Sequence, residues 1–342
     1  MIQRVAVIGA GSWGTALASV LADNGHEVTL WVRDPKQAEA INTTHTNQKY
    51  LPGAKLSDRI VASADLPGAV AGKRIVLLVV PSHAVRQMCR ELAMLVEPDV
   101  LLIHAVKGFE LESLKRMSEV IREEFPQPIA SRLAVISGPS HAEEVVQRQP
   151  TTVVVASESE ESMLRAQDLL MNRNFRVYTN PDLVGVEIAG ALKNIIALGA
   201  GLSDGLGFGD NAKAALLTRG LAEITRVGLK LGALPQTFSG LAGIGDLVAT
   251  CTSRHSRNWR AGSLLGQGKS LDEVLGEIGM VVEGVRTTQA AFALAKREDV
   301  EMPITHVLYD ILFAGKDPRQ GVEELMGRLK TYEMKYLNPD HV

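Results

Sequence analysis

The sequence predicts an α/β protein in which a doubly wound, mostly parallel sheet is followed by an all-helical region. Three observations support this fold class. Short apolar runs alternate with helical stretches in the first half, a glycine-rich turn joins the first run to the first helix, and helical periodicity alone continues from about Asp182. The 342 residues suffice for two domains with separate cores. We expect one domain at residues 1–181 and the other at 182–342.

The expected strands are short apolar runs, of the kind found where a strand is buried on both faces. A helix over Ala16–Asn24, ended by Gly25, separates the first two strands. The regular order of strand, helix and strand predicts parallel pairing. The expected strands are Arg4–Ile8, Glu27–Val32, Ile75–Val80, Val100–Val106, Leu133–Ile136 and Thr152–Ala156.

Apolar residues at helical spacing dominate the second region, and no strand is expected beyond about Val177. We expect no apolar run of the ~20 residues that a membrane-spanning helix needs, and so no membrane segment. The expected helices are Val184–Gly201, Asn211–Leu231, Leu271–Glu277, Thr287–Arg297 and Ile304–Ala314.

Composition points to an ordinary globular protein, with 46% hydrophobic and 22% charged residues. The net charge of −3 gives no electrostatic reason to expect a nucleic-acid partner. The two cysteines, Cys89 and Cys251, form no paired metal motif or disulfide framework, which fits a reducing compartment. The start of the chain shows no signal-peptide pattern. We therefore expect a cytoplasmic protein without a metal site.

The pattern GxGxxG, formed by Gly9, Gly11 and Gly14, directly follows the first expected strand and precedes a helix. In a Rossmann-type unit the first glycine allows a tight turn. The second lets the backbone approach a pyrophosphate, and the third lets helix and strand pack closely. The helix N-terminus offers free N–H groups to phosphates. This context predicts dinucleotide binding, and the alternative is a glycine-rich turn without a ligand.

Arg33 and Asp34 follow the second expected strand, where the adenosine ribose is read. An acidic residue there accepts from the 2′-OH of NAD, whereas an arginine accommodates the 2′-phosphate of NADP. Arg33 comes first, which favours NADP(H) with NAD(H) also accepted. The alternative is a surface ion pair before Pro35.

Two lysines are candidates for handling the hydroxyl proton of a hydride-transfer reaction. Lys107 follows the expected strand Val100–Val106, at the carboxyl edge where open α/β sheets bind ligands. Lys193 lies inside an apolar helical stretch, where an ammonium group needs partners. Two lysines at one site lower each other's pKa, and so favour a base near neutral pH. The alternative for Lys193 is a side chain that reaches the surface along its helix.

Two further segments carry polar groups next to glycines. In Ser137–Glu143, the spacing of Ser140 and Glu143 predicts a helix-capping box. Capping would explain both residues without a functional role. This helix start also falls at the sheet edge where a ligand is expected. In the second region, Asp246 ends a glycine-rich run, and Arg257 offers a planar fork suited to a phosphate. Ser256 and Asn258 flank Arg257 as further donors. The alternative is a polar surface loop.

With these residues in place, the chain resembles the bacterial type of NAD(P)-dependent glycerol-3-phosphate dehydrogenase from residue 4 to about 330. The ALKN, GDL and SRN segments are specific to this family among dehydrogenases. Departures are Ile244 and Arg33, the latter at a position that varies among relatives. The resemblance rests on GAGSWGTALA, VPSHA, AVKGFE, SGPSHAEEV, EIAGALKNIIALGAGLSDGLGFGDNAKAAL, LAGIGDLVATC, SRNWRAG and VVEGVRT.

The resemblance implies the 6-phosphogluconate dehydrogenase-like arrangement of the two domains and a role for each matched residue. Lys193 matches the lysine that accepts the hydroxyl proton, and Lys107 matches one that contacts substrate and cofactor. Further substrate contacts are implied for Gly138, Ser140, Asn194, Asp246, Ser256, Arg257 and Asn258, the last three with the substrate phosphate. Dinucleotide contacts are implied for Ser12, Trp13, Arg33, Lys107, Ala142, Arg257, Val281 and Glu283.

The implied reaction interconverts sn-glycerol 3-phosphate and dihydroxyacetone phosphate with NADP(H) or NAD(H), and supplies phospholipid synthesis. The family also implies a homodimer. One alternative is a dehydrogenase of the same architecture for a 3-hydroxy acid or 6-phosphogluconate, which the SRN and VKG segments disfavour. Another is a cofactor-binding sensor without catalysis, which the presence of Lys193, Asn194, Asp246 and Arg257 disfavours.

Overall fold

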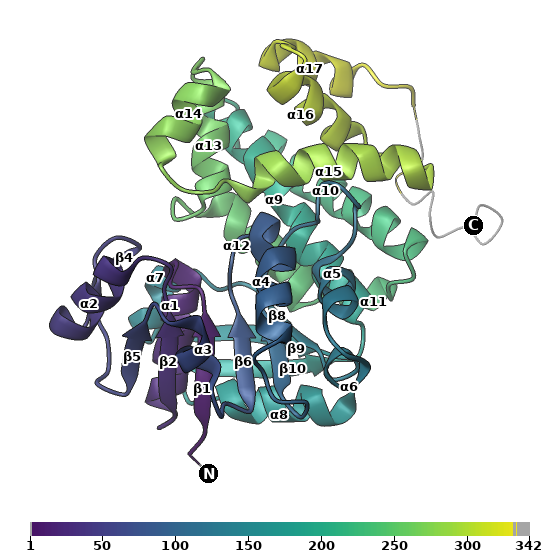
Figure 1. The fold of residues 1–342 in the computed structure, drawn as a ribbon. Helices are drawn as coiled ribbons and strands as arrows, with labels where there is room; N and C mark the ends of the chain where they lie inside the picture. The colour runs from purple at the N-terminus through teal and green to yellow at the C-terminus, as the bar shows by residue number, and fades with distance from the viewer. Residues whose placement is uncertain (1, 331–332, 334–342) are drawn as a thin grey trace.

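The computed structural model describes residues 2–330 and 333. A sheet forms one region, and a group of helices lies beyond the sheet edge at which β1 ends (Figure 1). Eight strands form the sheet, in the spatial order β10 (Phe175–Asn180), β9 (Thr151–Ala156), β8 (Ala134–Ser137), β7 (Leu101–His104), β6 (Ile75–Leu78), β1 (Arg4–Ile8), β2 (Glu27–Trp31) and β5 (Ile60–Ser63).

The expected mostly parallel sheet is confirmed, with one reversal. In spatial order, the neighbouring strands β5, β2, β1, β6, β7 and β8 pair in parallel. Strand β9 pairs antiparallel with β8, and β10 pairs parallel with β9. A parallel crossover needs a dozen or more residues, usually with a full helix. Between β8 and β9 the chain forms only the five-residue helix α7 (Ala142–Val146). The direction of the strands therefore changes at this connection.

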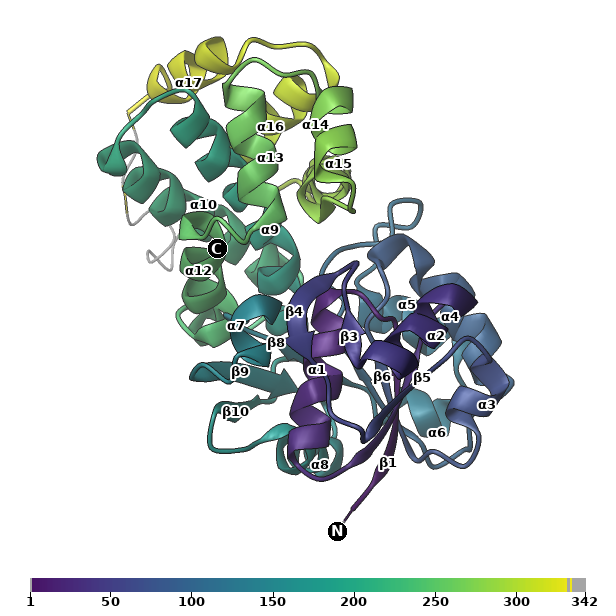
Figure 2. The ribbon, with the colours of Figure 1, turned by 90° about the vertical axis from the view of Figure 1, so that its left-hand side faces the viewer.

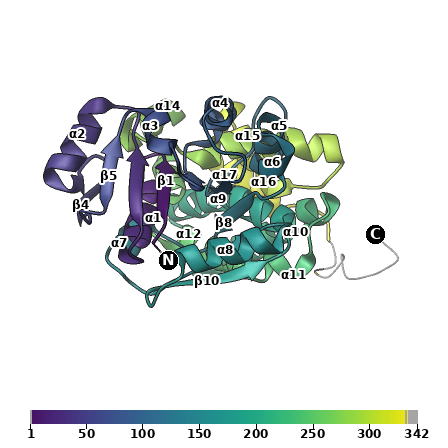
Figure 3. The same cartoon turned by 60° about the horizontal axis from the view of Figure 1, so that its bottom comes forward.

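Helices cover both faces of the sheet. Figure 3 shows α7 and α8 on one side and α3, α4 and α6 on the other. Buried side chains of α1, α2, α7 and α8 pack with Val5 and Val7 of β1, whereas those of α3, α4, α5 and α6 pack with Ala6 and Ile8. The helices are α1 (Ser12–Asp23), α2 (Pro35–Thr44), α3 (Leu66–Val70), η1 (Ser82–Ala84), α4 (Val85–Ala93), α5 (Met117–Glu124), α6 (Gln127–Ala130) and α8 (Glu160–Leu170).

The sequence interpretation omitted several elements of this region. It did not predict β5, β10 or the antiparallel pair β3 (Thr46–Asn47) and β4 (Leu51–Lys55). These strands lie at sheet edges or outside the main sheet. Their buried residues are therefore interspersed with exposed ones, and the strands lack a continuous apolar run. The first helix begins at Ser12 rather than Ala16, because Gly11 is its N-cap, and Gly25 follows it with a φ of 86°.

The described residues of the second region contain helices joined by turns and loops, without a strand, and each expected helix is present. Figure 2 shows α9 and α12 where the helical region meets the sheet region. The shorter helices, including α12 and α13, were not predicted from the sequence. The helices are α9 (Leu183–Gly205), α10 (Asp210–Lys230), α11 (Pro235–Phe238), η2 (Leu241–Gly245), α12 (Asp246–Thr252), α13 (Arg257–Gly266), α14 (Leu271–Ile278), α15 (Glu283–Glu298), α16 (Pro303–Phe313) and α17 (Pro318–Met326).

Helix α9 joins the two regions. Its apolar side chains share one core with Val135 of β8 and Val154 of β9, so α9 covers one face of the sheet at these two strands. Residues around Pro181 lead directly from β10 into α9, and we propose the domain division there. Residues 331–332 and 334–342 of the expected second domain lie outside the described residues.

The expectation that no apolar run reaches membrane-spanning length was wrong for α9. This helix has 23 residues and an 18-residue window of mean hydropathy 1.6, of which 94% is buried inside the protein. A buried core helix meets the same criteria of length and composition as a membrane span. The packing of α9 against the sheet and against α10, α12, α13 and α15 accounts for its apolar character.

Candidate active site

The glycine-rich loop has the geometry expected of each glycine. Gly9 has a φ of 118°, and a Cβ there would lie 2.6 Å from the carbonyl oxygen of Val79. A Cβ on Gly14 would lie 1.8 Å from the carbonyl oxygen of Gly9, so helix and turn pack in direct contact. A Cβ on Gly11 would meet no atom within 4 Å. The loop is therefore closed behind Gly9 and Gly14 and open at Gly11, the N-cap of α1.

Residues next to this loop hold it in place. The hydroxyl of Ser12 donates to the carbonyl oxygen of Tyr50 at 2.6 Å. The buried amide of Asn47 donates to the carbonyl oxygen of Ala10 at 2.9 Å, which ties β3 to the turn. Trp13 is partly buried against the same core that contains Ala142, at the start of α7. Ser12 and Trp13 begin α1, and Ala142 begins α7, which packs against α1.

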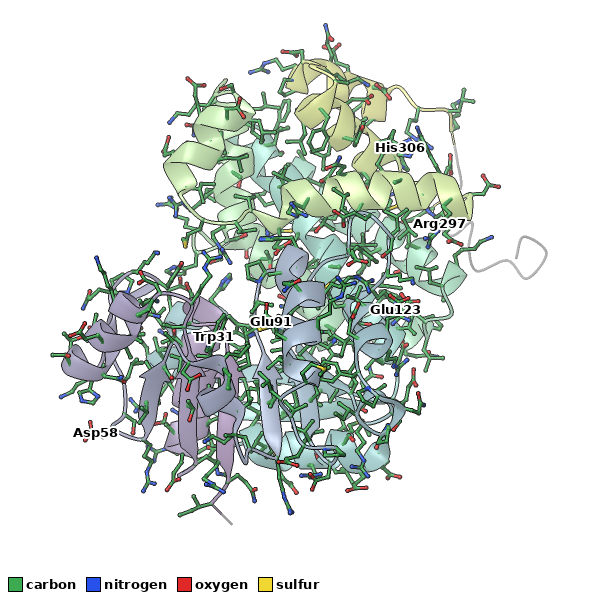
Figure 4. All side chains as sticks on the ribbon, in the orientation of Figure 1. Trp31, Asp58, Glu91, Glu123, Arg297 and His306 are labelled. Atoms are coloured by element: carbon green, nitrogen blue, oxygen red, sulfur yellow. The ribbon has the colours of Figure 1, made fainter. Side chains whose placement is uncertain are left out.

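At the end of β2, Arg33 and Asp34 have different surroundings. This end lies at the sheet edge that faces the helical region, as the position of Trp31 shows, whereas Arg297 and His306 lie far from it (Figure 4). The carboxylate of Asp34 caps α2 by accepting from the backbone N–H of Lys36 at 3.0 Å. Arg33 is exposed and has no hydrogen bond or ion pair with the described residues. The alternative of an Arg33–Asp34 ion pair is therefore contradicted.

Lys107 and Lys193 converge on one carboxylate. The Lys193 ammonium donates to Oδ1 of Asp246 at 2.5 Å, and the Lys107 ammonium donates to Oδ2 at 2.6 Å. Lys193 and Asp246 are buried, and Lys107 is partly buried. The alternative in which Lys193 reaches the surface is contradicted. Lys107 lies in the loop that follows β7, so the cluster joins both regions of the protein.

Thr250 completes this cluster, although sequence analysis did not select it. Its hydroxyl accepts from Lys193 at 2.6 Å and donates to the main-chain oxygen of Asp246 at 2.6 Å. The signal was the spacing of four residues between Asp246 and Thr250, which places both on one face of α12. The helix itself was not predicted, so the spacing carried no weight.

The cluster alters the proton affinity of its members. Burial, opposed by Asp246 and assisted by the charge of Lys107, lowers the pKa of Lys193 to about 8. Burial alone would raise the pKa of Asp246, but the charges and hydrogen bonds of Lys107 and Lys193 outweigh it and lower that pKa. The cluster thus combines a carboxylate that stays ionised with an amine that can exchange a proton near neutral pH.

The segment after β8 lies against the same cluster. The Lys107 ammonium is 3.4 Å from the carbonyl oxygen of Gly138, whose φ is 124°. Ser140 turns its hydroxyl back to that oxygen at 3.0 Å. The predicted capping box is wrong, because His141 is the N-cap of α7 and no side chain caps this helix. The Ser140 hydroxyl bonds to the carbonyl oxygen of Gly138 instead, so helix capping does not account for this residue.

A cavity of about 350 Å³ opens beside Ser140. Its lining comes from Ser140 and its two neighbours, from Glu144 of α7, and from α12 with the residue after it. The Nε2 of neighbouring His141 donates to the carbonyl oxygen of Ala249 at 3.1 Å, which holds these two segments together. Solvent-sized molecules therefore have room between the two regions at this position.

The SRN residues begin α13 and are tied to α9. Ser256 is the buried N-cap of α13, and its hydroxyl accepts from the N–H of Trp259 at 3.2 Å. The buried Asn258 amide donates to the side-chain oxygen of Asn194 at 2.9 Å. Arg257 remains exposed and donates to the carbonyl oxygen of Val281 at 2.9 Å. A polar surface loop is therefore contradicted for Ser256 and Asn258.

The start of α15 continues this set of contacts to the sheet. The Asn258 side chain accepts from the N–H of Gly284 at 2.8 Å, next to Glu283. The Glu283 carboxylate accepts from the hydroxyl of Ser82 at 2.8 Å and from its N–H at 3.2 Å. Ser82, in η1 after β6, was not predicted as a site residue, although its motif VPSHA was noted. Contacts thus connect Lys107, Lys193, Asn194, Asn258 and Glu283 across both regions.

Comparisons with protein families give two matches. Residues 4–163 match the family described as NAD-dependent glycerol-3-phosphate dehydrogenase N-terminus. Residues 182–323 match its C-terminus. A glycerol-3-phosphate dehydrogenase [NAD(P)+] of Geobacillus kaustophilus is 59% identical over 338 residues and covers 98% of each chain. One from Bacillus cereus (strain B4264) is 57% identical over 99% of each chain.

Solved structures give a consistent picture. The crystal structure of a glycerol-3-phosphate dehydrogenase from Coxiella burnetii is 39% identical, covers 96% of this chain and 99% of its own, and has a TM-score of 0.92. A ketopantoate reductase family protein from Ralstonia eutropha, 18% identical with a TM-score of 0.60 over 95% of this chain and all of its own, shares the fold alone.

Proposed function

The chain belongs to the family of NAD-dependent glycerol-3-phosphate dehydrogenases, and from this premise we propose which residues carry its reaction. The enzyme is an NAD(P)-dependent oxidoreductase that interconverts sn-glycerol 3-phosphate and dihydroxyacetone phosphate. The observation that supports the site best is the pair of ammonium groups, from two regions of the chain, on the buried carboxylate of Asp246.

Lys193 is the proposed proton acceptor during alcohol oxidation and the proton donor during ketone reduction. Its pKa of about 8 allows both protonation states near neutral pH. Asp246 orients the Lys193 ammonium and offsets its charge when it is protonated, and the Thr250 hydroxyl accepts a second hydrogen bond from it. Lys107, which is the less buried of the two lysines, faces the oxygen on which negative charge develops.

The substrate phosphate is the proposed ligand of Ser256 and Arg257. Arg257 is exposed, and its one hydrogen bond to Val281 leaves further guanidinium donors for an anion. Asn258 and Asn194 bond to each other and hold α13 on α9, with N–H groups left for substrate. A phosphate bound away from the reacting carbon aligns that carbon and excludes plain glycerol. Gly138 and Ser140 complete the substrate side.

The shape of the sheet edge suits a dinucleotide. The open space at Gly11, the free N–H groups at the start of α1 and the unpaired Arg33 suit a pyrophosphate and a 2′-phosphate. When bound, the nicotinamide supplies or accepts the hydride. The remaining proposed contacts are Gly9, Ser12, Trp13, Gly14, Lys107, Ala142, Arg257, Val281 and Glu283. Arg33 favours NADP(H), with NAD(H) accepted.

The test follows NADPH and NADH absorbance with dihydroxyacetone phosphate, using dihydroxyacetone as control. Oxidation with the phosphorylated ketone alone supports both the reaction and the phosphate site. The ratio of rates with the two cofactors tests the role of Arg33. Folded protein that binds NADPH but oxidises it with neither ketone would contradict the reaction and favour the sensor alternative.

We further propose that the enzyme works in the cytoplasm as a homodimer and feeds phospholipid synthesis. The family membership supports these points. Sedimentation velocity at micromolar concentration tests the dimer, for which a species of one chain's mass would be the contrary result.

A further inference from the structure

A second buried carboxylate, Glu187, connects the two regions behind the lysine cluster. It lies in the first turns of α9. Its Oε1 accepts from the N–H of Ser118 at 2.7 Å, and its Oε2 accepts from the Ser118 hydroxyl at 2.5 Å and from the Arg116 guanidinium at 2.6 Å. The His104 ring nitrogen Nε2 lies 3.3 Å from Oε1. All these partners belong to the sheet region.

Glu187 and its partners are close in sequence to both lysines. His104 ends β7, three residues before Lys107. Glu187 precedes Lys193 by six residues, which is about 9 Å along an α-helix. Between them, a Cβ on Gly190 would lie 2.8 Å from the Ser137 hydroxyl and 3.7 Å from Cγ of Lys107. The α9 backbone is thus in close contact with the Lys107 side chain itself.

The interaction of Glu187 with the sheet region is strong because its carboxylate is charged, buried and hydrogen-bonded. Burial alone would raise the pKa of Glu187, but His104, Arg116 and the Ser118 hydroxyl outweigh it and lower that pKa to about 2. The carboxylate therefore stays ionised at any working pH. A buried charge that loses its hydrogen-bond partners is strongly destabilised, so α9 has one favourable position against α5 and β7.

We propose that Glu187 is a positioning residue for the reaction, which holds α9 against the end of β7 so that Lys193 and Lys107 meet on Asp246. The inference rests on the catalytic role proposed for the two lysines. Glu187 shares no hydrogen bond with Asp246 or either lysine, and it acts only through the placement of α9.

The decisive variant is Glu187→Gln, which keeps the size of the side chain but removes its charge and one acceptor. Misplacing a catalytic group by about 1 Å can reduce turnover about a hundredfold. We expect kcat per folded molecule to fall at least tenfold with dihydroxyacetone phosphate. The Kd for NADPH, measured by fluorescence, stays within twofold because the glycine-rich loop is not involved.

Glu223→Gln is the matched control. Glu223 is another buried carboxylate, but it accepts from the N–H groups of Ile304 and Thr305 within the helical region. We expect this variant to keep kcat within twofold. The wild type is assayed alongside, and its failure to reduce dihydroxyacetone phosphate would count against the proposed function rather than against Glu187.

A purely structural role would lower the melting temperature and the folded yield of Glu187→Gln but leave kcat per folded molecule unchanged, and that result overturns the proposal. If the variant does not fold, Ser118→Ala decides the question. It removes one donor to Glu187 and keeps the backbone N–H. A loss in kcat of threefold or more, with unchanged NADPH binding, supports the proposal, and an unchanged kcat overturns it.

Discussion

Around Gly11 the backbone borders open space, whereas around Asp246 both carboxylate oxygens already accept from ammonium groups. The glycine-rich loop belongs to the sheet region alone and leads into the start of α1, which no side chain caps. The lysine cluster is assembled from both regions, is largely buried, and satisfies its charges internally. A flexible or exposed lysine would keep its ordinary pKa, but burial beside a second cation brings that of Lys193 to about 8.

The difference separates binding from chemistry. In the proposed function, the open loop binds the cofactor through its shape and its backbone donors, and an added side chain would obstruct that approach. The filled cluster needs its proton-handling group placed before substrate arrives, because preorganised charge is what stabilises a transition state. Changes at the loop should therefore affect cofactor affinity, and changes at the cluster should affect turnover.

Lys193→Ala should have the largest effect. Removing the proposed acid–base group lowers kcat about 10³-fold, within the range typical of such groups. NADPH affinity should stay within threefold, because the loop is intact. Stopped-flow absorbance and NADPH titration measure the two quantities. Lys213→Ala, which removes a cation paired with Asp204 in the same region, is the control. Turnover near that of the wild type would remove Lys193 from the mechanism.

Arg257→Ala should come next. Hydrogen bonds between charged groups contribute roughly 1.5–3 kcal/mol, so loss of this contact raises the KM for dihydroxyacetone phosphate about a hundredfold. The effect on kcat should be smaller. Arg254→Ala removes an exposed cation three residues away and serves as control. Steady-state kinetics at saturating NADPH would contradict the phosphate role if the KM were unchanged.

Gly11→Ala tests the loop directly. Its φ of −72° suits alanine and its Cβ position is empty, so folding should be unaffected. A methyl group there would occupy the path of the pyrophosphate, and we expect NADPH to bind about twentyfold more weakly, a change of about 1.8 kcal/mol. Gly276→Ala, at another open glycine in α14, is the control. Unchanged NADPH binding would mean that the open space at Gly11 is not used.

The pH dependence tests the cluster without a mutation. In its proposed role, Lys193 must be protonated for reduction and neutral for oxidation, so reduction should slow and oxidation should quicken as the pH rises through about 8. Between pH 7 and 9 the protonated fraction falls about tenfold, and reduction rates should follow. Rates measured under saturating conditions that stay constant up to pH 10 would exclude Lys193 as the donor.

These two parts of the site also differ in how far the sequence predicts them. The loop lies within a few residues, so the spacing of Gly9, Gly11 and Gly14 predicts its geometry. Lys193 and Asp246 were recognised as candidates, but their contact depends on α12, a helix that the sequence interpretation missed. Thr250 was missed for the same reason. At Ser140 a local capping pattern predicted the wrong partner, because the turn at Gly138 competes for the hydroxyl.

Arg33→Ser should have the smallest effect. It tests whether the cofactor site extends to Arg33, beyond the end of β2. Arg33 is exposed, so solvent screens its interaction with a 2′-phosphate, and we expect the preference for NADPH over NADH to fall about fivefold. Turnover at saturating NADH should not change, because the lysine cluster is untouched. Lys36→Ala, a nearby exposed cation on α2, is the control. If both variants shift the preference equally, the 2′-phosphate is held by general positive charge rather than by Arg33 itself.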